Sequence, residues 1–211
     1  QKNMKIIEDL KPTTLYSAVA IAPFDLAKRA LERKGYEVIS LEQNAQLRIQ
    51  QGSVHDVSRN GNWVREGVLY VPGKGKFLTK NSPIMQNPKK ATDAHRKGMD
   101  FYPTDKQVES SLEDSVLLSA KEIPTNRFGE DEITSFAFGP VAAQYGKFLK
   151  ESGINAMPIY TTDLQEKSFV RPLWFRDLDL GSSLSGGNGS LDGASRLRGV
   201  KIGAEGTRPK K

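Results

Sequence analysis

The stretch RDLDLGSSLSGGNGSLDGASRLRG, residues 176–199, differs in composition from the rest of the chain. Sixteen of its 24 residues are small turn-formers: six Gly, five Ser, three Asp, one Asn and one Ala. The other eight are five Leu and three Arg, and no Lys, Glu, Gln, Met or aromatic residue occurs. A flexible Gly/Ser linker is the simplest interpretation of such a composition.

Five leucines argue against a linker. They recur through the stretch, at Leu178, Leu180, Leu184, Leu191 and Leu197, and follow the aromatic pair Trp174-Phe175. A linker has no physical reason to carry spaced apolar residues, whereas loops laid against a core need them as anchors. We therefore predict packed loops in which the leucines are buried and the small residues face solvent.

The same run resembles the variable region of diversity-generating retroelement target proteins. The pattern is LxxxSxLxGxxxxLxxxxRxRGV, matched by Leu178, Ser182, Leu184, Gly186, Leu191, Arg196, Arg198, Gly199 and Val200, and Pro172-Leu173-Trp174-Phe175 fits the preceding positions. In that family a reverse transcriptase miscopies template adenines, so varied positions take Asn, Asp, Ser, Gly, Ala, Tyr or Arg but not Lys, Glu, Gln or Met. The resemblance covers residues 172–202.

The resemblance implies a C-type-lectin fold that displays varied residues as a ligand-binding face. Carried over, the varied positions are Arg176, Asp177, Asp179, Gly181, Ser183, Ser185, Gly187, Asn188, Ser190, Asp192, Gly193, Ala194 and Ser195. The fixed scaffold is Trp174, Leu178, Leu184, Leu191, Arg198, Gly199 and Val200. It implies a non-enzymatic, viral-type display protein on a virion or cell surface, with a protein or glycan ligand. Such display proteins are often homo-oligomers, but the sequence alone does not decide the oligomeric state. Small residues are poor binding hot spots, so we expect this copy to bind weakly.

The rest of the chain mixes helical and strand patterns without regular alternation, which favours an α+β class with about three helices. Strands are predicted at 14–21, 36–39, 63–71, 116–118, 134–138, 156–160, 173–175 and 200–202. Helices are predicted after Pro23, over 41–51, and after Gly139-Pro140. The spacing of Ser40 and Gln43 predicts a capping box. Residues 1–211 are expected to form a single domain, with residues 72–105 as a long basic loop.

Positive charge is concentrated in two segments, although the net charge is only +6. Residues 72–99 hold seven Lys or Arg against one Asp, and residues 196–211, which include the basic tail 201–211, hold six against one Glu. These segments support an alternative hypothesis, a nucleic-acid-binding protein that uses residues 74–97 and 196–211. That hypothesis predicts binding that weakens steeply with salt and survives replacement of residues 177–195.

Motifs for catalysis and cofactors are weak in this sequence. The 211 residues include no Cys and two His, so thiolate chemistry is excluded, a His-based metal site is not favoured, and we expect no cofactor. His55 and His95 are both expected on the surface. Glu130-Asp131-Glu132 supports a third hypothesis, a metal-dependent nuclease or phosphatase, but consecutive carboxylates point in different directions. No apolar stretch is long enough for a transmembrane helix.

Overall fold

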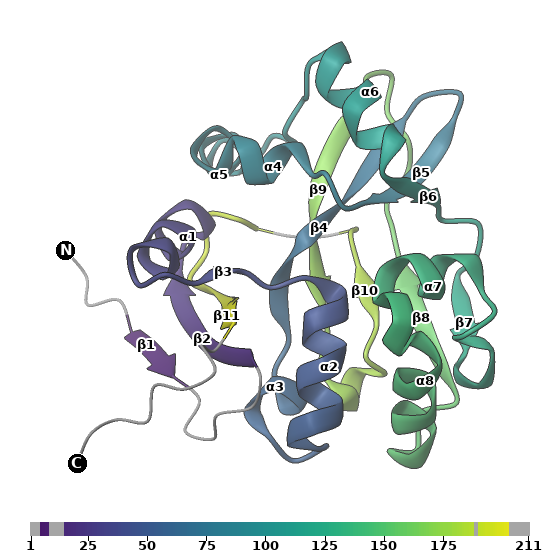
Figure 1. Ribbon diagram of the computed structural model, residues 1–211. Helices are drawn as coiled ribbons and strands as arrows, with labels where there is room; N and C mark the ends of the chain where they lie inside the picture. The colour runs from purple at the N-terminus through teal and green to yellow at the C-terminus, as the bar shows by residue number, and fades with distance from the viewer. Residues whose placement is uncertain (1–4, 9–14, 188–189, 203–211) are drawn as a thin grey trace.

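Eleven β-strands join in one hydrogen-bonded sheet in the computed structural model, which describes residues 5–8, 15–187 and 190–202 (Figure 1). The strands are β1 (Lys5–Glu8), β2 (Leu15–Ala22), β3 (Glu37–Val38), β4 (Asn62–Val71), β5 (Gly75–Thr79), β6 (Ser115–Leu117), β7 (Glu122–Pro124), β8 (Ala156–Tyr160), β9 (Phe169–Phe175), β10 (Leu184–Ser185) and β11 (Ser195–Ile202). The main path runs β1-β2-β11-β4-β9-β10-β8-β7, while β3 pairs with β11 and β5 pairs with β4 and β6.

Helices of four to eleven residues connect these strands. They are α1 (Phe24–Arg33), α2 (Leu41–Gln51), α3 (Asp56–Arg59), α4 (Pro83–Gln86), α5 (Pro88–Arg96), α6 (Asp105–Glu113), α7 (Glu132–Phe138) and α8 (Ala142–Glu151), with 3-10 turns η1 (Thr125–Arg127), η2 (Gly139–Val141) and η3 (Leu178–Leu180). Within the described residues there are thus eight α-helices, and the expectation of about three was too low. The α+β class is confirmed.

The sheet buries apolar side chains on both faces. Along β4, Val68 and Tyr70 pack with α2, α7 and α8, whereas Leu69 and Val71 pack with α1 and α5. This alternation follows from the two-residue repeat of a strand. In Figure 1 the first group of helices lies to the right of β4 and the second to its left. Two apolar layers therefore hold the central strands.

The last strand in the described sequence, β11, lies in the interior of the sheet. β11 pairs antiparallel with β2 from Ser195↔Ala22 to Ile202↔Leu15, and it pairs parallel with β4 at Leu197↔Trp63. β10 likewise lies between β8 and β9. The unusual stretch at residues 176–199 therefore connects interior strands and is anchored at both ends, as the leucine spacing predicts.

Several predicted elements are confirmed. The helix at 41–51 is α2, and its capping box pairs the Ser40 side chain with the Gln43 N–H and the Gln43 side chain with the Ser40 N–H. The strands predicted at 14–21, 63–71 and 156–160 correspond to β2, β4 and β8, and the helix after Pro23 corresponds to α1. Strong caps and apolar runs identify these elements without knowledge of the fold.

The predicted basic loop at 72–105 is wrong, because the segment contains β5, α4 and α5 and leads into α6. Its helices are short and bury little: α5 buries only Ala91 and Thr92. Such elements carry too few apolar residues for a periodic signal. The order comes from proline at the start of each helix and from contact with the sheet.

The predicted strand at 134–138 is also wrong, since these residues belong to α7. The Asp131 side chain accepts hydrogen bonds from the backbone N–H groups of Ile133 and Thr134, which starts a helix there. Gly139, with a φ of 54°, ends it after two turns. The cap outweighs the β-propensity of Ile133, Thr134 and the phenylalanines.

A buried carboxyl group supports the start of α2. Glu66 lies in β4 where the pairing with β9 shifts register, and its Oε2 accepts a hydrogen bond from the Leu41 N–H at 3.0 Å. Its Oε1 is buried without a hydrogen-bond partner among the described residues. Burial raises the pKa of Glu66 to about 7, against the opposing effects of backbone hydrogen bonds and of nearby Arg65 and Lys80.

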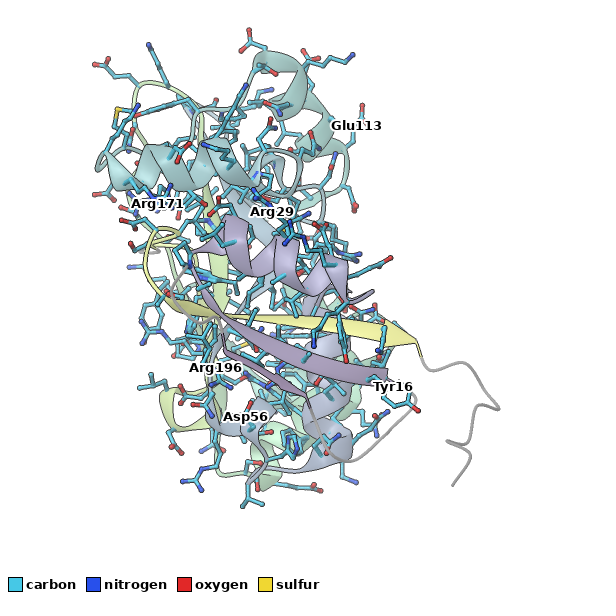
Figure 2. The ribbon with its side chains drawn as sticks, turned by 90° about the vertical axis from the view of Figure 1, so that its left-hand side faces the viewer. Tyr16, Arg29, Asp56, Glu113, Arg171 and Arg196 are labelled. Carbon is cyan, nitrogen blue, oxygen red and sulfur yellow. The ribbon has the colours of Figure 1, made fainter. Side chains whose placement is uncertain are left out.

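Replacing this carboxyl should stabilise the protein at neutral pH. The unfolded carboxyl ionises near its ordinary pKa of 4.5 but the folded one only near 7, so wild-type stability falls as the pH rises through that window. Glu66→Gln, which keeps an acceptor for Leu41, should gain on the order of 3 kcal/mol above pH 7 and little below pH 4.5. Urea unfolding from pH 4 to 8 measures this, with exposed Glu113→Gln as the control (Figure 2). A gain that is the same at every pH would contradict it.

Candidate ligand-binding surface

The segment 176–195 divides into two loops on either side of β10. The first extends the β9–β10 hairpin, where the Arg176 N–H donates to the Ser183 carbonyl and the Ser182 N–H donates to the Asp177 carbonyl. The second leaves β10 at Gly186 and enters β11 at Ser195. Different elements therefore hold the two loops in place.

Apolar and small side chains point inward from both loops. Leu184, Leu191 and Leu197 are buried, and Leu178 packs against the cluster that α2, α7 and α8 cover. These positions confirm the prediction of buried leucine anchors. Leu180 is the exception: 53% of its surface is exposed. It is the last residue of η3, directly before the turn at Gly181.

Arg48 in α2 holds the first loop in place from the protein interior. Its side chain is fully buried; Nε donates to the Val57 carbonyl at 3.0 Å, and Nη1 donates to the hydroxyls of Tyr145 at 3.1 Å and Ser182 at 3.0 Å. Its guanidinium also lies 3.9 Å from the centre of the Phe175 ring. These contacts offset part of the cost of burying the charge, while Nη2 is buried without a hydrogen-bond partner among the described residues. Arg48 therefore fixes Ser182 relative to α2, α3 and α8.

The first loop is tightly turned above Arg48. The Asp177 carboxylate accepts a hydrogen bond from the Leu180 N–H and caps η3. Gly181 and Ser182 follow with φ values of 72° and 53°. Ser182 is the one non-glycine residue with positive φ in the described chain, and left-handed backbone is unfavourable for such a residue. The bonds of its hydroxyl to Arg48 and Tyr145 offset that cost.

The second loop is held at its start by side chains of the sheet. The Tyr70 hydroxyl donates to the Gly186 carbonyl at 2.9 Å, and Arg171 donates to the Gly187 carbonyl. Arg171 is itself paired with Asp100 at 2.8 Å. Burial tends to raise the pKa of Asp100, but hydrogen bonds from Arg171 and Gln165 outweigh it and lower that pKa. The ion pair of Arg171 with Asp100 thus positions the start of this loop.

Leu191 anchors the middle of the second loop. Its side chain is buried, its carbonyl accepts from the Phe24 N–H at 2.8 Å, and its N–H donates to His95 Nδ1 at 3.2 Å. Burial lowers the pKa of His95, against the opposing charges of Asp100 and Asp192. A neutral ring suits its role as an acceptor. The two histidines, both expected on the surface, are half-buried, and His55 Nδ1 accepts from the Val57 N–H.

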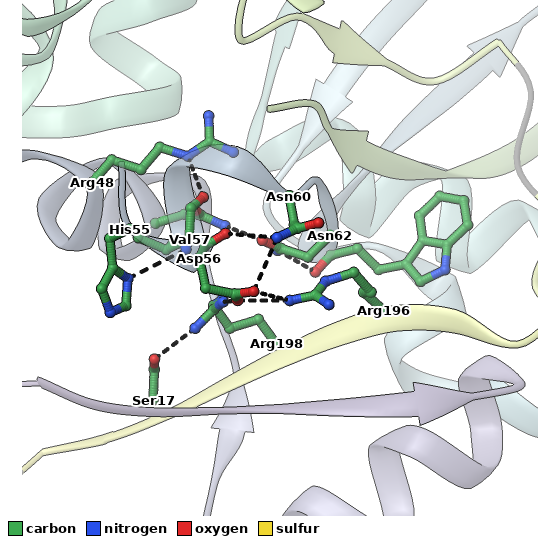
Figure 3. Close-up of polar contacts among 11 residues, drawn as sticks. Ser17, Arg48, His55, Asp56, Val57, Asn60, Asn62, Arg196 and Arg198 are labelled. Carbon is green, nitrogen blue, oxygen red and sulfur yellow. Dashed lines mark hydrogen bonds and ion pairs between the residues drawn. The ribbon is translucent and has the colours of Figure 1, made fainter. Parts of the chain in front are cut away.

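An arginine pair fixes the entry into β11 (Figure 3). Arg196 and Arg198 both donate to the carboxylate of Asp56 in α3, and Arg198 also donates to the Ser17 hydroxyl of β2 at 2.8 Å. Arg198 is buried, as a scaffold position should be, whereas Arg196 is half-buried. The cluster connects α3 to the interior strands β2 and β11. It marks the C-terminal limit of the candidate surface.

The predicted varied positions fall into three groups. Asp179, Ser190 and Ala194 are exposed, and seven others are half-buried: Arg176, Asp177, Gly181, Gly187, Asp192, Gly193 and Ser195. Ser185 in β10 and Ser183 just before it are buried, so a ligand cannot reach their side chains without rearrangement. Asn188 lies outside the described residues. Of the remaining scaffold positions, Gly199 and Val200 are buried and Trp174 is half-buried.

Other predicted sites take structural roles or remain dispersed. Asp131 caps α7, while Glu130 and Glu132 are exposed beside it. Within the described residues no three His, Cys, Asp or Glu side chains are grouped to hold a metal ion. The lysines of 74–97 sit on different elements, and Lys76 and Lys89 are bonded to Thr161 and Asp93. Across the part of the chain that the structure describes, no helix is long and apolar enough to cross a membrane.

Comparisons with known proteins place this arrangement in one fold. No protein-family model and no curated protein matches the sequence. A solved structure, described as "Accommodation of massive sequence variation in Nanoarchaeota by the C-type lectin fold", superimposes with a TM-score of 0.64. The match covers 96% of this chain and 98% of the other at 14% identity. The chain therefore has the C-type lectin fold, as the resemblance implied.

We expect the Ser182 side chain to stabilise the protein, although the segment around it consists mostly of small residues. Ser182→Ala keeps the unfavourable backbone conformation but removes the hydroxyl that accepts from buried Arg48. We expect it to lower the free energy of unfolding by about 2 kcal/mol. Exposed Ser190→Ala, the matched control, should change it by less than about 0.5 kcal/mol. Chemical denaturation measures both, and equal effects would contradict the anchoring role.

Proposed function

We propose that this chain is a non-enzymatic binding protein that selects its ligand with the solvent-facing residues of the segment 176–195. The observation that carries this proposal is the separation of roles within the segment. Inward residues such as Leu184, Leu191 and Ser182 hold the loops, whereas the outward ones take little part in the core. Outward residues can therefore change without loss of the fold.

We further propose that the outward residues are diversified by a retroelement. Two observations support this. The segment uses only residue types that adenine-directed miscopying produces, apart from its leucine anchors. The structurally similar protein is described as accommodating massive sequence variation in the same fold. The ligand of such a display protein is a protein or glycan on a cell or virion surface, and the display protein itself is viral and homo-oligomeric.

Nucleic-acid binding through residues 74–97 and 196–211 is the alternative function. The lysines of the first segment lie on a turn, a strand and a helix, and Lys80 and Lys89 are engaged with Phe136 and Asp93. Dispersed and partly paired cations bind phosphates less well than a row of free ones. We therefore favour ligand selection by the segment 176–195.

A tyrosine scan tests whether the segment accepts variation where the proposal requires it. Ser190→Tyr and Ala194→Tyr place a ring in solvent and should change the free energy of unfolding by less than about 0.5 kcal/mol. Ser183→Tyr and Ser185→Tyr force a ring into filled space and should each cost more than about 2 kcal/mol. Denaturation curves of the four variants decide this. Equal losses at all four positions would contradict a diversified surface.

Sequencing the DNA around the gene tests the origin of the variation. We expect a near-copy of the codons for residues 172–202 that differs only at adenines, next to a reverse-transcriptase gene. Substitutions between the two copies should fall on the outward positions and spare Leu178, Leu184 and Leu191. A flank without such a repeat would leave the composition of the segment without this explanation and favour the nucleic-acid alternative.

A further inference from the structure

Tyr160 lies beside the candidate surface although it belongs to a different part of the sequence. It ends β8 directly opposite Ser185 of β10, and Ser185 in turn lies opposite Trp174 of β9. Residues opposite one another in a sheet point to the same face. The Tyr160 carbonyl also accepts the Gly186 N–H at 2.9 Å, where the second loop begins. Half of its surface is exposed, at 50%.

Arg176 lies over this tyrosine. Its guanidinium is 5.5 Å from the centre of the Tyr160 ring, within the range of a cation–π contact. Among the described residues Arg176 forms no ion pair, and its Nε is buried without a hydrogen-bond partner. The side chain is therefore oriented by the ring while its outer N–H groups remain available as donors.

Leu180 is the third large side chain in this region, and it is exposed at 53%. The Asp177 carboxylate holds its N–H, and the next residue, Gly181, approaches Pro158 of β8: a Cβ at Gly181 would lie 3.3 Å from the proline Cδ. The turn that carries Leu180 is thus fixed against the strand that carries Tyr160. A fixed turn loses little conformational entropy on binding.

We propose that Tyr160, Arg176 and Leu180 form an anchor patch that provides most of the binding energy for a protein partner. This inference rests on the proposed function and deepens it, because it adds two large side chains from outside the predicted varied positions, Tyr160 and Leu180, to Arg176, which is one of those positions. Tyrosine and arginine are the residue types that dominate binding hot spots, and a tyrosine ring held in place costs little entropy to bury. The small varied residues around the patch then adjust shape rather than supply energy.

The chemistry of the patch indicates what occupies it. Tyr160 and Leu180 offer apolar surface, which fits a large aliphatic or aromatic side chain. Arg176 offers donors, but Asp177 and Asp179 on the same turn repel a strongly acidic segment. The occupant is therefore a protein segment of low net charge with one large apolar side chain, whose carbonyl oxygens accept hydrogen bonds from Arg176.

Panning a random 12-residue peptide library on phage against the full chain tests this proposal. We expect enriched peptides to share one large apolar residue. Synthetic versions should lose affinity at least about tenfold with Tyr160→Ala, Arg176→Gln or Leu180→Ser. Matched exposed residues elsewhere serve as controls: Tyr102→Ala, Arg29→Gln and Leu117→Ser should change the Kd less than about twofold.

The outcomes separate this inference from the proposed function. Peptides that bind the Tyr160→Ala variant as well as wild type but lose affinity with changes at Gly187, Ser190 or Asp192 would overturn the anchor patch and leave the proposed function standing. If panning enriches nothing beyond a selection on an unrelated protein, a protein occupant is wrong. Binding on a glycan array would then still support ligand selection, and its absence as well would count against the proposed function.

Discussion

The hydrogen bonds of Arg48 join α2 to nearby α3 and to two segments far away in sequence, α8 and the first loop. One guanidinium contacts the carbonyl of Val57, the hydroxyls of Tyr145 and Ser182, and the ring of Phe175. A cation in such a place costs several kcal/mol of desolvation, which the bonds of Nε and Nη1 offset in part, while Nη2 has no hydrogen-bond partner among the described residues. The helices α2, α3 and α8 and the first loop must therefore assemble together, and the position of the loop follows from the position of the charge.

Both loops of the candidate surface are held in a fixed conformation, but by different residues. The first relies on Arg48 beneath it and on the Asp177 cap within it. The second relies on Arg171, paired with Asp100, and on the buried side chain of Leu191. In each loop a few contacts hold particular groups in place: the Ser182 hydroxyl and the Leu180 N–H in the first loop, and the Gly187 carbonyl in the second. The contacts to Ser182 and Gly187 do not involve the exposed side chains of Asp179, Ser190 and Ala194, whereas the cap of the first loop depends on Asp177, one of the predicted varied positions.

Sequence reasoning identified the segment and most of its anchors but not what holds them. The leucine spacing predicted burial correctly at Leu184 and Leu191, and the capping box located α2, because these signals are local. It failed where the outcome depends on neighbours distant in sequence: Ser183 and Ser185 resemble the other small residues of the segment, yet their side chains are buried. The sequence did not indicate the roles of Arg48 and Tyr160, because the role of a charged or aromatic residue depends on partners that only the structure identifies. The short helices in 72–105 carried too little apolar sequence to be found.

The interior position of β11 has a consequence for synthesis. β2 lies near the start of the described chain, yet its partner is formed by residues 195–202 near the end. The sheet cannot close until residues 195–202 have left the ribosome, and contacts of such long range form slowly. The segment at 176–195 must therefore turn twice and deliver β11 before the protein is stable. A substitution in that segment therefore acts on folding as well as on the surface that the two loops present.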